Sequence, residues 1–196
     1  MANRTYKKNN FWLVTLVTTL ATMATLSVTS CSVVYPRQQP VGQRFPSVQG
    51  KALDDKVYSI PESFNGEVVL LLVGYKMDTQ FDLDRWILGL HDTKVSIPVY
   101  EVPTIPGMVP GLFAERINDG MRSGIPSEDW AIVITLYDDA HHVARFLGNE
   151  NSLPTRVVLL DREGHVRFFH DRGFSLKTLL ALQDEISKVV SEPGAS

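Results

Sequence analysis

The chain has 196 residues, a formal net charge of −3 and a single cysteine. Nucleic-acid-binding proteins show a basic face, so the acid excess argues against a nucleic-acid partner. One cysteine cannot form an intramolecular disulfide.

The N-terminal segment predicts a secretory signal peptide. Three basic residues precede an uncharged, apolar run over residues 11–26, and small residues then lead to Cys31. The tetrapeptide Val28-Thr29-Ser30-Cys31 resembles the lipobox of bacterial lipoproteins. The resemblance implies removal of residues 1–30, lipidation of Cys31 and attachment to membrane lipid. By the same resemblance, Ser32 points to the outer membrane of a Gram-negative cell.

Two alternatives for this segment remain open. The apolar run approaches the length that spans a bilayer, so it could stay uncleaved as a membrane helix. It could also be a plain signal peptide in which Cys31 is incidental. Cleavage removes three basic residues and no acid, and leaves 16 basic and 22 acidic residues in a chain of 166. That length suits one domain with a sizeable core.

Residues 31–50 predict a flexible, extended tether, because Pro36, Pro40 and Pro46 alternate with glutamines. The folded domain is expected over residues 51–190, with a frayed tail over 191–196.

The first strong element of the domain is the aliphatic run over 68–73, which is typical of a strand buried on both faces. Asp78 or Thr79 is expected to cap a helix that runs to about His91. Further elements are expected in this order: a strand over 95–102, a helix over 112–122, a strand over 130–136, a helix after Asp138 or Asp139, a strand over 155–160, a turn over 161–164, a strand over 166–170 and a helix after Ser175. This alternation predicts an α/β fold whose central mixed sheet is mostly parallel, has an antiparallel C-terminal hairpin and is flanked by helices.

Residues 153–173 resemble the C-terminal half of thioredoxin-like proteins. Leu153-Pro154-Thr155 leads into a strand, an Asp161–Gly164 turn, a second strand and Gly173 before the last helix. The resemblance implies a thioredoxin-like domain over roughly 45–190. It also implies a cis peptide at Leu153–Pro154, facing the active-site loop.

Thioredoxins carry Cys-x-x-Cys between the first central strand and its helix, where this chain has residues 75–86 and no cysteine. Thiol–disulfide exchange requires a thiolate, so redox activity does not carry over. Among thioredoxin-like groups without the thiols, the pattern is most similar to the mitochondrial ATP synthase assembly factors. That group shares Phe45-Pro46 and a tryptophan in the first helix, here Trp86.

The former active-site region is the candidate binding rim. A helix N-terminus favours anions, although acidic side chains there also predict self-capping. Asp82 and Asp84 face different sides of the helix, which argues against a catalytic carboxylate pair, and no catalytic residue is assigned. The candidate rim residues are Tyr75, Asp78, Asp82, Arg85, Trp86, Arg145 and Pro154.

Two further features bear on a possible partner or metal site. The Pro- and Gly-rich insertion over 103–126 carries Met108, Leu112 and Phe113, which either contact a partner or complete the core. His141 and His142 point about 100° apart on a helix, so they cannot share a metal ion. No metal and no cofactor are expected.

These features favour a non-redox binding, assembly or chaperone-like module of the bacterial envelope that acts on a protein partner. One alternative is a thiol-independent envelope enzyme, or a peroxide-handling relative, using the rim over residues 75–86. The enzyme predicts a deep pocket with carboxylates of perturbed pKa, whereas a shallow rim with water-facing aspartates argues against it. An envelope protein with a purely structural role is a third possibility.

Overall fold

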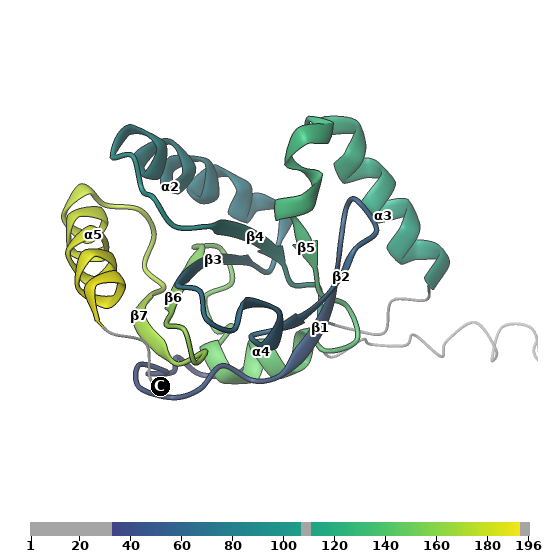
Figure 1. Ribbon diagram of the computed structural model, residues 1–196. Coiled ribbons are helices and arrows are strands. Elements are labelled where there is room, and N and C mark those ends of the chain that lie inside the picture. The colour runs from purple at the N-terminus through teal and green to yellow at the C-terminus, as the bar shows by residue number, and fades with distance from the viewer. Residues whose placement is uncertain (1–32, 107–110, 193–196) are drawn as a thin grey trace, which may run out of the picture. The chain divides into compact units, whose positions relative to one another are not determined.

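The computed structural model describes residues 33–106 and 111–192, whose strands form two hydrogen-bonded sheets (Figure 1). The central sheet has the order β4-β3-β6-β7, and a smaller sheet has the order β2-β1-β5. The strands are β1 (Val48–Ala52), β2 (Val57–Ile60), β3 (Val69–Gly74), β4 (Val99–Pro103), β5 (Ile134–Thr135), β6 (Arg156–Leu160) and β7 (Val166–His170). The signal peptide and Cys31 lie outside the described residues.

Within these described residues, four α-helices and three 3-10 helices accompany the strands. They are η1 (Glu62–Phe64), η2 (Met77–Thr79), α2 (Gln80–Asp92), α3 (Gly111–Gly124), η3 (Ser127–Ile132), α4 (Ala140–Leu147) and α5 (Leu176–Ser191). No helix of the described part is long and apolar enough to cross a membrane.

The central sheet is mixed, as predicted, but its parallel share is smaller than expected. Strands β3 and β4 pair in parallel. Two isolated parallel bridges, Glu101–Val133 and Thr104–Leu136, join the segment that contains β4 to the segment that contains β5. The β3–β6, β6–β7, β1–β2 and β1–β5 pairs are antiparallel. The reason is that β6 runs antiparallel to its neighbour β3, while β5, which follows β4 in the chain, pairs with β1 of the smaller sheet.

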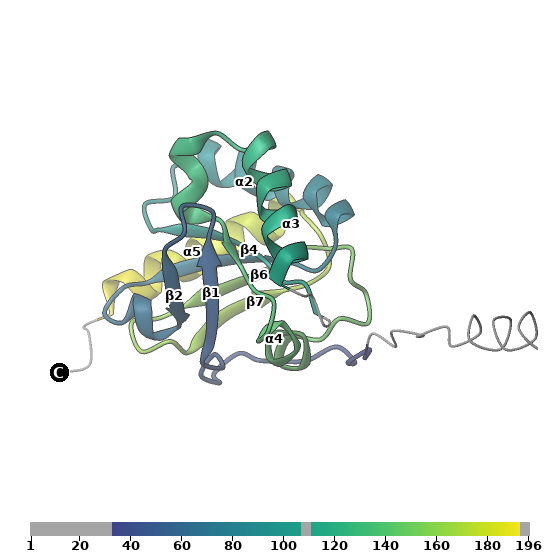
Figure 2. The same cartoon turned by 90° about the vertical axis from the view of Figure 1, so that its right-hand side faces the viewer.

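Strand β3 divides the core into two layers. Its residues alternate between faces, so Val69, Leu71 and Val73 pack with α4 and the β1–β2 hairpin, whereas Leu70 and Leu72 pack with α2 and α5. Figures 1 and 2 show α2 and α5 on one side of the central sheet and α4 on the other. Both faces of β3 are therefore covered, as its continuous aliphatic sequence predicts.

Two predicted strands are shorter in the structure. The strand expected over 95–102 begins only at Val99, after Pro98, which has no N–H for the ladder. The strand expected over 130–136 begins later, because residues 130–132 belong to the 3-10 helix η3, in which Trp130 Nε1 donates to the Ile125 carbonyl at 3.0 Å. Its remaining strand, β5, pairs with β1.

Residues 33–47, here called the N-terminal strap, lie against the domain, so the prediction of a tether over 31–50 is wrong where the structure describes it. The Tyr35 N–H donates to Asn149 Oδ1 at 2.6 Å, and Arg37 Nε donates to the Asp171 carboxylate at 2.7 Å. Phe45 is 2% exposed. Gly148, with a φ of +77°, lies so close to the strap that a Cβ there would stand 2.5 Å from the Pro36 carbonyl oxygen. Specific packing thus overrides the tether-like composition, and β1 follows at Val48.

The prediction of a cis Leu153–Pro154 peptide is also wrong. Among residues 33–106 and 111–192, the cis peptide bond joins Ile60 to Pro61. The loop before β6 is shaped instead by the Arg156 guanidinium, whose Nη atoms donate to the carbonyls of Asn151 and Pro154.

Helix α5 is fixed at both ends. Ser175 Oγ accepts from the Thr178 N–H, which confirms the predicted cap, and Leu179, Leu182 and Ile186 are buried as predicted. Val190 is 42% exposed, however, and Val189 is buried in its place. A helix has 3.6 residues per turn, so inward positions alternate between spacings of three and four, and here the last spacing is three.

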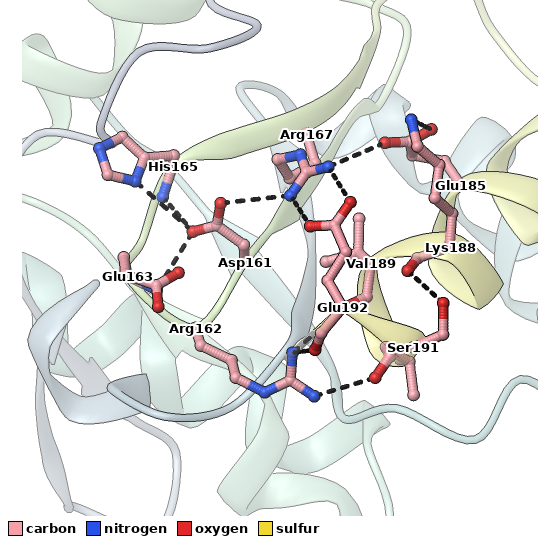
Figure 3. Close-up of polar contacts among 11 residues, drawn as sticks. Asp161, Arg162, Glu163, His165, Arg167, Glu185, Lys188, Val189, Ser191 and Glu192 are labelled. Atoms are coloured by element: carbon pink, nitrogen blue, oxygen red, sulfur yellow. Dashed lines mark hydrogen bonds and ion pairs between the residues drawn. The ribbon is translucent and has the colours of Figure 1, made fainter. Parts of the chain in front are cut away.

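At its C-terminal end, α5 is joined to the β6–β7 hairpin by two arginines (Figure 3). Arg162 donates to the carbonyls of Val189, Val190 and Glu192. Arg167 donates twice to the Glu192 carboxylate, at 2.6 and 2.7 Å. Ordered structure thus reaches Glu192, two residues into the predicted frayed tail, and residues 193–196 lie outside the described part.

Candidate binding rim

The rim lies where β3 ends, α2 begins and the loop before β6 passes. Tyr75 directly follows β3, and Thr79 Oγ1 donates to the Ser152 carbonyl at 3.3 Å, which ties the helix start to that loop. Asp78 and Arg85 are exposed, and Pro154 is half-buried. Neither Asp78 nor Thr79 caps α2 with its side chain: Thr79 is the N-cap residue but has helical backbone angles and makes no capping bond.

Asp82 joins two loops through hydrogen bonds, and we call it a structural pin for this reason. Its Oδ2 accepts from the Thr155 N–H at 2.9 Å, and its Oδ1 accepts from the Phe174 N–H at 2.7 Å. Gly173, with a φ of +83°, lets the second loop turn directly beside this carboxylate. Because both oxygens of this half-buried side chain already accept backbone bonds, Asp82 holds the rim together rather than facing a ligand.

Tyr75 and Arg156 fill the space beneath the rim. The guanidinium carbon of Arg156 lies 4.6 Å from the centre of the Tyr75 ring, and both side chains are buried. Burial raises the pKa of Tyr75 and lowers that of Arg156. The chain therefore places a stacked aromatic–cation pair near the position where thioredoxins carry thiols.

Two predicted rim residues do not belong to the rim. Trp86 is fully buried in the core, where its ring packs edge-on against Phe174 at 5.2 Å. Arg145 lies over the Tyr35 ring at 5.6 Å, so it contacts the N-terminal strap. Helical periodicity explains the first correction, since Trp86 lies three residues after Leu83 on the inward face of α2, and the position of the strap explains the second.

Exposed apolar side chains surround the start of α2. Met77 is 91% exposed, Phe81 is 76% exposed, and Leu153 of the facing loop is 52% exposed. We call these three residues the apolar rim patch. Single exposed apolar residues are ordinary, but these three lie on two segments that the Thr79–Ser152 hydrogen bond joins, which makes them the candidate contact surface.

A groove of about 660 Å³ opens beside the rim, between α2, α3, η3 and β4. Its acidic lining consists of Asp84, Glu101 and Asp129. Burial, followed by the nearby charges of Asp84 and Asp129, raises the pKa of Glu101 to about 7. Met121, Ile125 and Pro126 of the predicted insertion also line the groove. Among the apolar residues predicted there to contact a partner or complete the core, Phe113 is 60% exposed, whereas Met108 and the Leu112 side chain lie outside the described part of the chain.

Sequence reasoning missed Arg156 and Glu101, although each left a signal. Both are charged residues inside otherwise apolar strands, Arg156 at the start of β6 and Glu101 in the middle of β4. Charged side chains are rarely buried unless they are paired, so a charged residue within an apolar strand indicates a candidate functional position.

No group of three or more potential metal ligands occurs within the described ranges. The His141 and His142 rings lie 3.9 Å apart, and His141 Nδ1 lies 2.9 Å from the Asp138 carbonyl oxygen.

The sequence matches no known protein family and no curated protein. Solved structures do match. A protein disulfide isomerase-like protein from Bacteroides thetaiotaomicron is 16% identical, with a TM-score of 0.51 over 82% of this chain and 95% of that one. A SCO1/SenC family lipoprotein from Bacillus anthracis is 11% identical, with a TM-score of 0.52 over 80% and 100%. A DsbE-like thiol:disulfide interchange protein from Chlorobium tepidum is 16% identical, with a TM-score of 0.50 over 80% and 100%. The fold is therefore thioredoxin-like.

Proposed function

We propose that this chain is a lipid-anchored, thiol-independent thioredoxin-like protein of the bacterial envelope, which binds a protein partner through the apolar rim patch. Cys31, the only cysteine, serves as the anchor, and acylation at this position gives durable attachment to the membrane. The partner docks where the redox members of the fold carry thiols.

The apolar rim patch carries the proposal. Met77 and Phe81 expose most of their surface on either side of the helix start, and Leu153 is exposed on the loop that the Thr79–Ser152 hydrogen bond joins to it. Large, exposed apolar side chains are the usual anchors of protein interfaces, because their burial removes apolar area from water.

The rim gives little support to the enzyme alternative. Asp78 and Asp84 are exposed, and Asp82 is bonded to two backbone N–H groups. The raised pKa belongs to Glu101 in the groove, a residue outside the predicted rim.

The similarity to the ATP synthase assembly factors adds no function. The two residues that carry it, Phe45 and Trp86, are both core residues. Packing in the core explains both residues, and neither lies at a surface that a partner could contact.

Photo-crosslinking in intact cells tests this proposal. A photoreactive phenylalanine analogue at position 81 or 153 is expected to give one discrete product, whereas the analogue at Val57, an exposed apolar residue of β2, gives none. Binding of the purified, captured protein should weaken about tenfold with Phe81→Asp, which places a charge in an apolar contact. Identical products from positions 81 and 57, or unchanged affinity with Phe81→Asp, would contradict the rim proposal.

The anchor is tested separately. Cys31→Ala is expected to abolish incorporation of a labelled fatty acid and to release the protein from the membrane fraction. Continued labelling of this variant would show that another site carries the lipid.

A further inference from the structure

We propose that the groove between α2, α3, η3 and β4 binds a lysine side chain, flanked by apolar residues, on a protein partner, and that the Glu101 carboxylate pairs with its ammonium group. The inference rests on the proposed function only in taking the occupant to be part of a protein. The groove's 660 Å³ falls within the range of ligand pockets, so it accommodates a lysine with parts of its neighbours.

The walls of the groove suit an alkyl stem. Aliphatic and methionine side chains from all four elements and their connecting segments make up half of its lining residues. A lysine packs its methylene groups along such surface while its charged head reaches a polar group. The apolar lining residues are Ile87, Leu90, Val95, Val99, Met121, Ile125, Ile132 and Val133.

Glu101 supplies the matching charge. Its side chain is half-buried, and within the part of the chain that the structure describes it makes no hydrogen bond or ion pair. Asp84 and Asp129 add negative potential, which together with burial raises the pKa of Glu101 to about 7. A carboxylate held in this way lacks a cation, and an ammonium group placed beside it would favour the charged form.

The other charges of the groove select the same ligand. Its titratable lining consists of Asp84 and His91 from α2, Glu101 from β4 and Asp129 from η3, with no lysine or arginine. Three carboxylates repel an acidic segment and attract a basic one. Lysine carries its compact ammonium on a flexible, unbranched alkyl stem, which suits a groove that combines aliphatic walls with one partly buried carboxylate.

Helix α3 leaves room for the occupant. Gly120 lines the groove, and a Cβ built on it would meet no atom within 4 Å. A larger side chain at this position would therefore enter the groove instead of the core.

Calorimetry with three capped pentapeptides tests the proposal. Each has the sequence Ser-Leu-X-Leu-Ser, where X is lysine, norleucine or glutamate, and the protein is the full lipidated chain in lipid nanodiscs. At pH 8 we expect the lysine peptide to bind about tenfold more tightly than the norleucine peptide. The glutamate peptide should not bind. Equal affinities for the lysine and norleucine peptides would overturn the inference.

Variants identify the pairing residue. Glu101→Gln should remove the advantage of lysine over norleucine, whereas Asp92→Asn, which removes an acid of α2 outside the groove lining, should preserve it. Gly120→Leu should weaken both peptides by filling the groove, and it keeps the test informative if Glu101→Gln folds poorly. Retention of the lysine advantage by Glu101→Gln would refute the assigned pair.

The pH dependence gives an independent readout. Lysine binding should weaken as pH falls below about 7, because protonation of Glu101 removes its charge. Imidazoles titrate in a similar range, so His91→Gln serves as the control and should leave this dependence in place. If the pH dependence disappears in His91→Gln and persists in Glu101→Gln, it arises from His91, and the inferred pairing with Glu101 is contradicted.

The rim and the groove can fail separately. Loss of the lysine preference with crosslinking at position 81 intact would remove the groove inference alone. Failure of the crosslinking with a lysine preference intact would instead move the docking site from the apolar rim patch to the groove.

Discussion

Arg156 and Glu101 are charged residues within apolar strands, and their environments differ. The Arg156 guanidinium is buried, donates to two loop carbonyls and stacks on Tyr75. The Glu101 carboxylate faces a groove. A charge removed from water needs compensation, so the first residue stabilises a loop and the second favours a ligand.

The two hydrogen bonds accepted by Asp82 predict a clear loss of stability when they are removed. Asp82→Ala leaves the N–H groups of Thr155 and Phe174 without their acceptor and should lower the free energy of unfolding by about 2–3 kcal/mol. Chemical denaturation measures the loss. The matched control is Asp78→Ala, an exposed position in η2, which should change stability by less than about 0.5 kcal/mol. Equal losses for the two variants would show that Asp82 is not a pin.

The raised pKa of Glu101 should make the free energy of unfolding depend on pH even without a ligand. Its pKa is raised from 4.5 to about 7 in the folded state, so the folded state binds more protons than the unfolded state between these values. The free energy of unfolding should therefore fall as pH rises from about 4.5 to 7, by on the order of 2 kcal/mol. Glu101→Gln should flatten this change and be more stable than the wild type above pH 7. Denaturant titrations at pH 5 and 8 measure it, and parallel pH profiles of the two proteins would contradict the assignment.

At the scale of elements, helices were predicted better than the strands between them. Helix α5 begins at the predicted Ser175 cap, and its apolar residues face the core at helical spacing. Residues 130–132 were predicted to begin a strand, yet they form the end of η3, because Pro126 and the Trp130–Ile125 hydrogen bond favour a tight turn there. Short apolar runs do not separate strand from helical turn by sequence alone.

Two glycines near helices should respond in opposite ways to substitution. Gly120→Ala should stabilise the protein by about 0.5–1 kcal/mol, since the added methyl meets open space and alanine favours helix. Gly148→Ala should destabilise it, because φ is +77° and the methyl would meet the Pro36 carbonyl. Thermal unfolding compares the two variants, and stabilisation by Gly148→Ala would mean that the strap does not pack there.

At the scale of the whole molecule, the N-terminal strap and the β1–β2 hairpin add a packed segment and a second, smaller sheet to the central sheet. The strap runs along the end of α4 to β1, and β1 pairs with both β2 and β5 (Figure 2). Asn149 Nδ2 donates to the Val33 carbonyl, so contact between the strap and the domain begins at the first described residue.

The strap should contribute measurably to stability. A chain that begins at Gly42 loses the Tyr35–Asn149 and Arg37–Asp171 contacts, and its unfolding temperature should lie roughly 5 °C below that of a chain that begins at Val33. Scanning calorimetry measures the difference. Arg37→Ala should account for only a small part of it, because Arg37 is well exposed and exposed ion pairs contribute little. Identical unfolding temperatures for the two chains would mean that the strap is bound too weakly to matter.

The sequence alone determined the alternation of elements, the buried central strand, the hairpin with its turn at Gly164 and the absence of any thiol except Cys31, because each depends on local periodicity, turn chemistry or a count of residues. Tertiary structure decided the rest. Asp82 acts as a pin because Thr155 and Phe174 approach it from distant parts of the chain. Trp86 is buried because α5 and its preceding loop cover α2. Glu101 faces a groove because α3 and η3 stand beside α2, and no sequence spacing encodes which distant side chains surround a charge.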